Sequence, residues 1–414
     1  MDFLLRPTPI NKKFITPGVF ILILLAINGL VFLATRFIFG LGATTNLCNQ
    51  HPWGIWIAID VATGVALAAG GFTSAALGHI IHKERYHAIL RPALLTAMLG
   101  YTFVAIGVFV DLGRYYSIWH PLIMWNGTSP LFEVGICVMI YATVLYIEFL
   151  PIVTEKFLGI MRFKRSFLGL NKPIYAILRF LDRGLEKTMF IFIIAGVVLS
   201  TLHQSSLGTL MVIAGPKMHP LWQTPILPLL FLISAIAVGF PMIIFESLLA
   251  SRSLGLKMEM DILTRLAKRV APLLGIYLAV KLIDMVIRGT YVYLTEINVQ
   301  SVMFVLEIVI GIIIPLRMLF SEKVLKSPLW LFVSASFVVA GVVINRINCF
   351  LVAYSAPYAL DSYFPSIGEI SVTVGFIAIL VLLYRAFVMF FPIISVPDRK
   401  LMPKTKYSIM GGEK

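Results

Sequence analysis

Ionisable side chains stand inside otherwise apolar segments of the chain, where they could hold or move protons. The clearest of them are Asp60, Asp111, Arg114, Glu133 and His203. An ionisable group in the interior of a membrane is costly, so it needs either a partner or a function. A buried carboxylic acid can exchange a proton, and an imidazole can pass one on near neutral pH. These five residues are therefore the candidates for a site that binds a polar ligand and handles protons.

The spacing of these residues allows two interpretations. Asp111 and Arg114 stand three positions apart, on one helix face, and Glu133 opens the next apolar segment at a similar depth. They form either a salt bridge that joins two helix ends or a proton-handling cluster. His203 is followed by Gln204, and such polar pairs can hydrogen-bond neighbouring helices. The same imidazole can also hydrogen-bond the carbonyl of a quinone and pass it a proton.

A second set of polar residues falls in the half of the membrane expected to lie nearer the cytoplasm. The set consists of Ser74, Tyr101, Tyr141, Glu148 and Glu246. Together these side chains could carry protons from the cytoplasm to the outer site. The alternative is helix packing, which Ser and Tyr hydroxyls also serve.

Histidine and cysteine positions argue against bound metal cofactors. Of the seven histidines, only His203 falls inside an apolar segment, whereas a haem b between membrane helices usually takes two. The three cysteines, Cys48, Cys137 and Cys349, form no CxxC motif, and an iron–sulfur cluster typically needs four thiolates. The sequence therefore predicts no haem, no iron–sulfur cluster and no metal site in this chain.

Membrane helices are the elements that must position these residues. The chain is 59% hydrophobic and 13% charged, whereas soluble domains are about 45–50% apolar and about 25% charged. Apolar runs long enough to cross a bilayer lie at about 17–38, 53–78, 92–115, 131–154, 188–213, 226–250, 270–290, 301–320, 328–348 and 368–394. We predict an all-α integral membrane fold with ten transmembrane helices, in a single polytopic domain over residues 1–414.

Basic residues predict the orientation of these helices. Of the 34 Lys and Arg residues, 26 fall in the N-terminal segment and in 83–91, 156–187, 252–269, 323–326 and 399–414, which share one side. Only Arg114, Lys217, Arg288 and Arg346 fall in the loops of the other side. Positive residues are retained on the cytoplasmic side, so both termini are predicted to be cytoplasmic. The net charge of +14 is then explained by anionic lipid headgroups and not by nucleic acid.

This orientation places most of the intramembrane charge in the outer half. Beyond the five candidates, the outer half holds Lys281, Asp284, Arg288, Glu307, Arg346 and Glu369. The outer loops also contain Trp119 and Trp125, which are typical of an aromatic belt at the membrane interface and equally suit a docking surface. We therefore expect the functional site towards the outer leaflet.

Several short sequence motifs surround these polar positions. They are Phe39-Gly40-Leu41-Gly42, His51-Pro52-Trp53-Gly54-Ile55-Trp56-Ile57-Ala58-Ile59-Asp60, Arg91-Pro92-Ala93-Leu94-Leu95, Asp111-Leu112-Gly113-Arg114-Tyr115, Leu131-Phe132-Glu133, Leu202-His203-Gln204-Ser205-Ser206-Leu207-Gly208, His219-Pro220-Leu221-Trp222-Gln223, Asn345-Arg346-Ile347-Asn348 and Tyr363-Phe364-Pro365-Ser366. Together they resemble the NrfD/polysulfide reductase membrane-subunit family over most of the chain. The resemblance is to the ten-helix branch found in periplasmic uptake hydrogenases and in the menaquinone reductase complex of sulfate reducers.

The resemblance implies a fold, a substrate and partners. It implies two four-helix bundles plus two peripheral helices, with a quinone pocket near the outer face of the first bundle. The implied substrate is a quinone, with menaquinone the expected kind, and the chain itself would carry no redox cofactor. The implied partners are a periplasmic ferredoxin-like iron–sulfur subunit and a larger periplasmic redox subunit: a hydrogenase, a molybdopterin-type subunit or a multihaem cytochrome. The expected location is the bacterial inner membrane, and activity would belong to the complex.

Two other functions remain open from the residues alone. A secondary transporter would also carry intramembrane charges. Its distinguishing feature would be a discontinuous helix, and the candidate position for the break is Gly70-Gly71. A passive membrane anchor would explain the outer aromatic residues but not the buried carboxylates.

Overall fold

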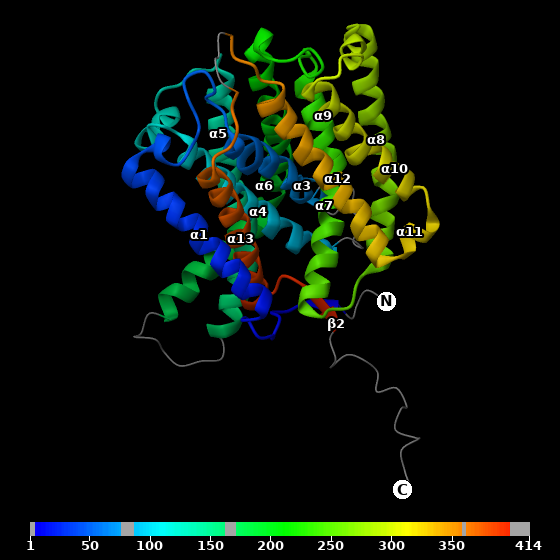
Figure 1. The fold of residues 1–414 in the computed structure, drawn as a ribbon. Helices are drawn as coiled ribbons and strands as arrows, with labels where there is room; N and C mark the ends of the chain where they lie inside the picture. Colours follow the sequence, from blue (N-terminus) through cyan, green and yellow to red (C-terminus); the bar gives the residue numbers. More distant parts are fainter. Residues whose placement is uncertain (1–4, 76–86, 162–170, 358–361, 398–414) are drawn as a thin grey trace.

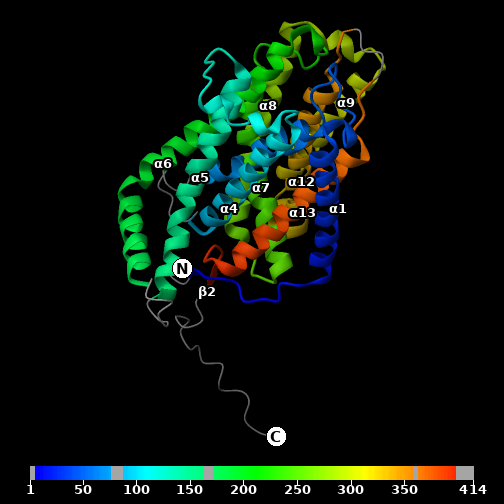
Figure 2. The same ribbon diagram turned by 90° about the vertical axis from the view of Figure 1, so that its left-hand side faces the viewer.

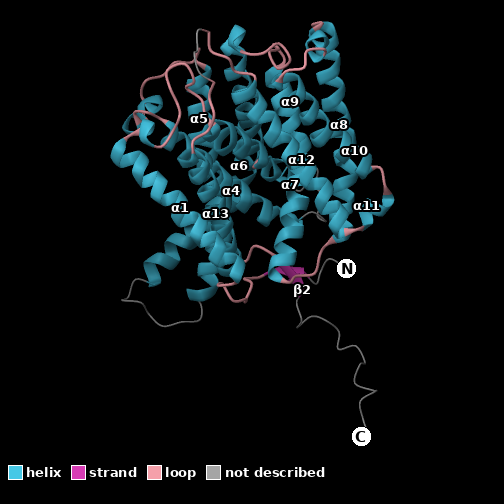
Figure 3. Cartoon of the chain, viewed as in Figure 1, coloured by secondary structure: helices cyan, strands magenta, loops and turns pink. Residues whose placement is uncertain are grey.

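Helices make up almost all of the structure (Figure 3). The computed structural model describes residues 5–75, 87–161, 171–357 and 362–397. Within these ranges, nine helices are long and apolar enough to cross a membrane, and Trp56–Gly71 is a shorter apolar helix. The predicted all-α membrane fold with ten helices is confirmed.

Ten spans follow one another along the chain. They are α1 (Pro17–Phe39), the second span made of η3 (Trp56–Thr63), α2 (Gly64–Leu67) and α3 (Ala69–Ala75), α4 (His87–Asp111), α5 (Pro130–Met161), α6 (Asn171–Ala214), α7 (Leu227–Leu254), α8 (Met260–Ile287), α9 (Val299–Ile308) with η10 (Val309–Ile313) and α10 (Ile314–Leu319), α12 (Pro328–Ile347) with η11 (Asn348–Val352), and α13 (Ile367–Phe390). The short helix α11 (Glu322–Lys326) joins α10 to α12.

Two helices begin well before the apolar runs that predicted them. Helix α8 starts at Met260 instead of near residue 270, and α6 starts at Asn171 although its membrane-spanning part begins at Lys187. A helix satisfies its own backbone hydrogen bonds, so it can continue into polar surroundings beyond the bilayer. Hydropathy therefore predicts which residues lie in the bilayer, but not where each helix begins or ends.

A two-stranded sheet brings the two ends of the chain together. Strand β1 (Leu5–Pro7) pairs antiparallel with β2 (Ser395–Pro397), with Leu5 opposite Pro397. Both ends therefore lie on one side of the helices, at the bottom of Figure 1. This side is called the terminal side below, and the opposite one the far side.

The spans pack as two bundles with a helix pair on the flank. The first bundle contains the second span, α4, α5 and α6, and the second contains α7, α8, α9–α10 and α12. Helix α7 contacts both α3 and α12 and so joins the bundles. Helices α1 and α13 pack against each other (Figure 1), and the view of Figure 2 places α1 and α6 at opposite edges.

Three spans contain a π-helical segment. These segments are η3, η10 and η11. A π-helical turn widens the backbone and frequently occurs at a functional site. Each segment contains or directly follows a buried polar side chain. Segment η3 contains Asp60, η11 begins at Asn348, and η10 follows α9, which carries Glu307.

Glycine pairs allow the closest helix crossings. The Cα of Gly311 lies where a Cβ on Gly341 would be, so η10 and α12 touch through their backbones. In the second span, a Cβ on Gly71 would lie 2.5 Å from the Cβ of Ala97. Gly71 thus allows a close contact with α4 and Gly70 one with α7, where a Cβ would lie 3.3 Å from the backbone oxygen of Gly239, although the span is interrupted next to the pair at Ala68.

We predict that Gly311→Ala destabilises the protein, because a methyl group would force η10 and α12 apart. Overpacking of this kind typically costs about 1–3 kcal/mol, which should lower the thermal unfolding midpoint in detergent. Gly275→Ala in α8 is the matched control, since nothing lies within 4 Å of a Cβ there. Equal midpoints for the two variants would contradict the close crossing.

Candidate functional site

His203 lies fully buried in the middle of the first bundle, on α6. Its Nδ1 is 3.2 Å from the hydroxyl oxygen of Tyr101 on α4. Its Nε2 has no hydrogen-bond partner among the described residues. If Tyr101 donates to Nδ1, then Nε2 carries the ring proton and is free to donate it to a ligand.

Gln204 extends this cluster towards the second span. Its side-chain nitrogen donates to the backbone oxygen of Val65 at 2.7 Å, while its Oε1 is buried without a described partner. The Oγ of Ser200, one turn earlier on α6, is buried within hydrogen-bonding reach of the hydroxyls of Tyr101 and Tyr141. Buried polar atoms are normally hydrogen-bonded, so the two unpartnered atoms, Nε2 of His203 and Oε1 of Gln204, indicate a ligand or ordered water.

Tyr141 and Glu148 continue the cluster along α5 towards the terminal side. The rings of Tyr101 and Tyr141 meet edge to face, with centroids 4.4 Å apart. Gly196 on α6 leaves room beside them, because a Cβ there would lie 2.7 Å from Oε1 of Glu148 and 3.6 Å from the Tyr141 ring. The structure thus brings together His203, Tyr101, Tyr141 and Glu148.

A group of carboxylates lies nearer the far side, between the second span, α4 and α13. Thr373 donates a hydrogen bond of 2.8 Å to Oδ2 of Asp60. Asp111 is close enough to interact electrostatically with both Asp60 and Glu369, and its Oδ1 is buried without a partner in the described part of the chain. Three acidic side chains, Asp60, Asp111 and Glu369, are thus gathered in one buried group.

Arg36 from α1 is the cation of this group. It is 2% exposed, and it donates to the backbone oxygens of Val110 and Leu112 at 2.7 and 2.6 Å. These carbonyls lie at the C-terminal end of α4, where a positive charge is favourable. Arg36 also interacts electrostatically with Asp111. Of the two interpretations of Asp111 and Arg114, the structure does not contain the salt bridge: Arg114 is exposed beyond the end of α4 and makes no ion pair with a described residue.

Glu369 is fixed by the segment that precedes α13. It accepts a hydrogen bond from the Tyr363 hydroxyl and another, of 2.9 Å, from the backbone nitrogen of Ser366. Burial and the neighbouring Glu369 carboxylate raise the pKa of Tyr363 well above its usual value. Tyr363 therefore remains a hydrogen-bond donor. A Cβ on Gly54 would lie 2.6 Å from the Tyr363 hydroxyl, so this contact requires glycine.

The remaining sequence candidates lie apart from these groups. Glu133 is exposed in the first turn of α5, and the far side also exposes Trp119 and Trp125. Glu246 on α7 lies beside Thr96 and Tyr384, near the terminal side. The side chain of Ser74 lies outside the residues that the structure describes.

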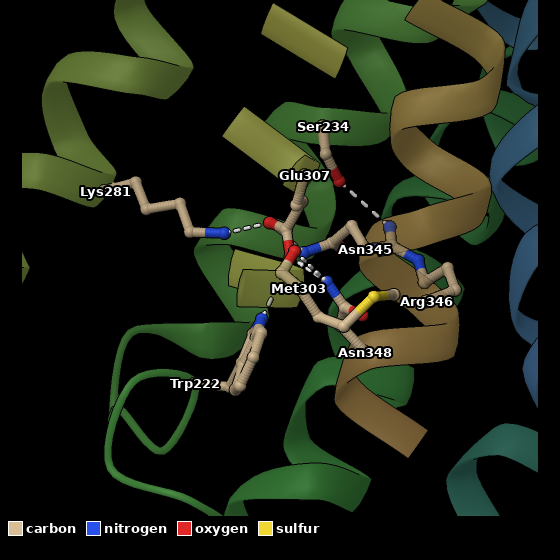
Figure 4. A network of polar contacts seen from close by, with 8 residues as sticks. All are labelled: Trp222, Ser234, Lys281, Met303, Glu307, Asn345, Arg346 and Asn348. Atoms are coloured by element: carbon tan, nitrogen blue, oxygen red, sulfur yellow. Dashed lines mark hydrogen bonds and ion pairs between the residues drawn. The ribbon is translucent and has the colours of Figure 1, made fainter. Parts of the chain in front are cut away.

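A second polar network fills the core of the second bundle (Figure 4). Its centre is the carboxylate of Glu307, which is 2% exposed and forms an ion pair with Lys281. Asn345, Asn348 and Trp222 each donate a further hydrogen bond of 2.9 Å to the same carboxylate. Four elements thus converge on one side chain.

Arg346 joins the network from α12 without a carboxylate of its own among the described residues. Its side chain is fully buried and donates to Oδ1 of Asn345 at 2.5 Å and to Oγ of Ser234 at 2.9 Å (Figure 4). The guanidinium also lies 3.6 Å from the centre of the Phe231 ring, a cation–π contact. Sequence reasoning placed these charges in one half of the membrane but did not reveal that they form one network.

The arrangement gives each bundle a different chemical character. The first holds unpartnered hydrogen-bond atoms beside a histidine, which suits a ligand with a carbonyl group. The second holds a charge network centred on Glu307, whose two carboxylate oxygens each accept two hydrogen bonds, while Nε of Arg346 and Oδ1 of Asn348 are buried without a partner among the described residues. No group of three His, Cys, Asp or Glu side chains that could hold a metal ion occurs among the described residues.

Comparisons with known proteins agree on one family. The family model described as polysulphide reductase, NrfD, matches residues 43–357. A probable Ni/Fe-hydrogenase 2 b-type cytochrome subunit of Escherichia coli (strain K12) is 32% identical over 94% of this chain and 95% of its own length. The integral membrane subunit of menaquinone reductase from Nitratidesulfovibrio vulgaris is 26% identical over 59% of this chain and 56% of its own. A selenate reductase subunit of Mesobacillus selenatarsenatis is 25% identical over 91% and 93%.

We predict that Lys281→Met and Glu307→Gln each destabilise the protein strongly, whereas the double variant is close to wild type. Removing one partner leaves the other charge buried and unpaired, which typically costs about 3–5 kcal/mol, and removing both avoids that cost. Thermal unfolding in detergent measures all three variants.

The exposed pair of Lys268 with Glu322 offers the control on the same helix. Lys268→Met should cost less than about 1 kcal/mol, because surface ion pairs are weak. Additive losses in the Lys281 and Glu307 double variant would show that the two side chains do not act as a pair.

Proposed function

The chain belongs to the NrfD polysulphide reductase family, and from this premise we propose that it is the quinone-interacting membrane subunit of a respiratory oxidoreductase complex. The observation that carries the proposal is the cluster of unpartnered polar atoms around His203. The relatives named above are subunits of a hydrogenase, a menaquinone reductase and a selenate reductase. Menaquinone is the proposed substrate.

His203 is proposed to bind a quinone carbonyl and to supply it with a proton. Tyr101 donates to Nδ1, which leaves the proton of Nε2 pointing to the ligand. The amide oxygen of Gln204 and the hydroxyl of Ser200 provide further polar atoms within the same helix. As two electrons arrive, the carbonyl oxygen becomes basic and takes the Nε2 proton, while the Tyr101 hydroxyl passes its proton to Nδ1 so that the imidazole stays neutral.

Two groups of side chains are proposed to replace the protons that reduction consumes. Tyr141 and Glu148 extend from Tyr101 towards the terminal side and would deliver protons from there. Asp60 and Asp111 lie towards the far side and would exchange protons with that side. Glu133 and Arg114, exposed at the far ends of α5 and α4, are proposed to guide protons to Asp111.

We propose that the terminal side faces the cytoplasm of a bacterial cell and that the far side faces the periplasm. The basic segments support this orientation, and the β1–β2 pairing is consistent with both termini on one side. The exposed Trp119 and Trp125 would then contribute to the docking surface of a ferredoxin-like iron–sulfur subunit. A larger periplasmic redox subunit would supply or accept the electrons.

Haem is not part of this proposal, although one relative is named a b-type cytochrome subunit. The described histidine buried in the spans is His203, and its ring nitrogen faces Tyr101 and not a second histidine. No second histidine contacts His203 among the described residues, which supports the proposal of a subunit without a haem held by two histidines. Electrons would pass directly between the docked iron–sulfur subunit and the quinone.

The proposal is tested by purifying the tagged chain in mild detergent and identifying its companions by mass spectrometry. We expect an iron–sulfur subunit, a larger redox subunit and roughly one quinone per complex. Recovery of the chain alone, without quinone or redox partner, would contradict the proposal and favour a transporter.

We also predict that His203→Leu lowers quinone turnover by at least about 100-fold, the usual range for a lost acid–base group. The complex should still assemble, because the change is between buried side chains of similar size. Thr201→Val is the matched control, since the Thr201 hydroxyl bonds its own helix at Val198. Turnover of His203→Leu equal to that of the control would remove His203 from the site.

A further inference from the structure

The network of the second bundle holds two cations for one carboxylate. Lys281 and Arg346 are 5% and 0% exposed, and Glu307 is the carboxylate between them. The adjacent Asp284–Arg288 pair contains one negative and one positive charge, so it leaves the excess of one positive charge in the network unchanged. An arginine keeps its proton in proteins. Lys281 is therefore the member that can remove the excess charge, by releasing a proton.

Glu307 is held as a carboxylate by donors. Lys281 and Asn345 donate to Oε1, and Trp222 and Asn348 donate to Oε2. In contrast, the ammonium of Lys281 has three donors, and its acceptor among the described residues is Glu307. The ammonium also lies near two aromatic rings, with the centres of Phe304 and Tyr277 at 4.8 and 5.8 Å. Lys281 thus has donors left over for water.

Few titratable or charged groups of the described residues face Lys281 from the elements around it. Glu307 faces it from α9, Cys349 from η11 and Tyr277 from its own helix, whereas Arg346 on α12 lies on the other side of Glu307 (Figure 4). The Asp284–Arg288 pair begins about one helical turn after Lys281 on α8. The adjoining part of α7 brings Ser234, which is not titratable. Glu307 is thus the acceptor of a proton that moves within the network.

Small cavities lie on both sides of the ion pair. The far-side cavity, about 10 Å³, is lined by Lys281, Thr224, Asp284 and Arg288. The other, about 20 Å³, is lined by Glu307 and Ser234 and lies deeper in the bundle. Such volumes are about the size of one water molecule. Tyr277 and Asn345 line both cavities, so the ion pair separates two places where water can reach it.

A dry layer closes the deeper cavity towards the terminal side. Val338 lines that cavity and also the next void, which has no room for water. The void is bordered by Val270, Leu319 and Leu331, with Ser334 as its polar member. The Oγ of Ser334 is buried without a partner among the described residues. A proton cannot cross such a layer until water enters it.

We propose that the Lys281–Glu307 pair is a proton-binding relay in a route through the second bundle, separate from the quinone site. Protonated Lys281 gives its proton to water in the far-side cavity, which leaves a neutral amine and a hydronium ion. Glu307 then takes a proton from a hydronium ion in the deeper cavity, which leaves water there, and passes it to the neutral amine of Lys281, which restores the ion pair. The layer around Val338 and Ser334 keeps the route closed at rest.

A passive proton leak tests this route without any quinone chemistry. Val338→Ser should wet the dry layer, because it removes two methyl groups and adds a hydroxyl one turn from Ser334. The purified complex, reconstituted in liposomes with a pH-sensitive dye inside, should then leak protons several-fold faster than wild type. Val198→Ser is the matched control, since Val198 lies exposed on α6.

Adding Lys281→Arg to Val338→Ser should abolish the leak, because arginine retains the positive charge and the partner but cannot release a proton. Lys281→Met with Glu307→Gln should abolish it too, which covers the case in which arginine does not fit. A leak that persists in both combined variants would overturn the proposal, as would a folded Val338→Ser variant that does not leak. Quinone turnover, measured separately, reports on the proposed function and not on this route.

Discussion

The absence of water in the bilayer core is the constraint on which this structure depends, and Glu307 shows how it is met. A carboxylate in that environment needs a partner for each lone pair. Glu307 obtains them from α8, from α12 and η11, and from the loop that carries Trp222. The positions of four segments are therefore set by one side chain. Backbone contact at Gly311 and Gly341 lets the helices approach closely enough for this to occur.

The two bundles differ in how their buried polar groups obtain hydrogen-bond partners. In the second bundle the carboxylate is saturated, so its geometry is fixed before any ligand arrives. In the first bundle the polar atoms of His203 and Gln204 are left without partners among the described residues, which is costly unless something else satisfies them. The π-helical segments η10 and η11 lie beside the Glu307 network, and η3 contains Asp60 of the carboxylate group. Widened backbone thus accompanies a buried carboxylate in both bundles.

Hydropathy and charge alternation were sufficient to predict the number and type of the helices, because each span must satisfy its backbone internally. The tertiary partners were not accessible in the same way. The local spacing of Asp111 and Arg114 suggests a salt bridge between them as one interpretation. In the structure, α1 instead supplies Arg36, 75 residues away from Asp111 in sequence, to the same end of α4. His203 was identified because it is ionisable and intramembrane, but its contact with Tyr101 depends on which helices adjoin. Helix contacts of this kind are set by packing, which leaves no short-range pattern in the sequence.

The pairing of α1 with α13 bears on how the protein is made. Helix α1 precedes the other described spans along the chain, yet its main packing partner, α13, follows them all. It must therefore enter the bilayer and remain there without that partner while the two bundles assemble. Its composition suits this, since its mean hydropathy of 2.5 equals the highest of any candidate span and little of its surface is buried by protein. The final step of assembly is then the arrival of α13, which supplies Thr373 and Glu369 to the carboxylate group and closes β1 on β2.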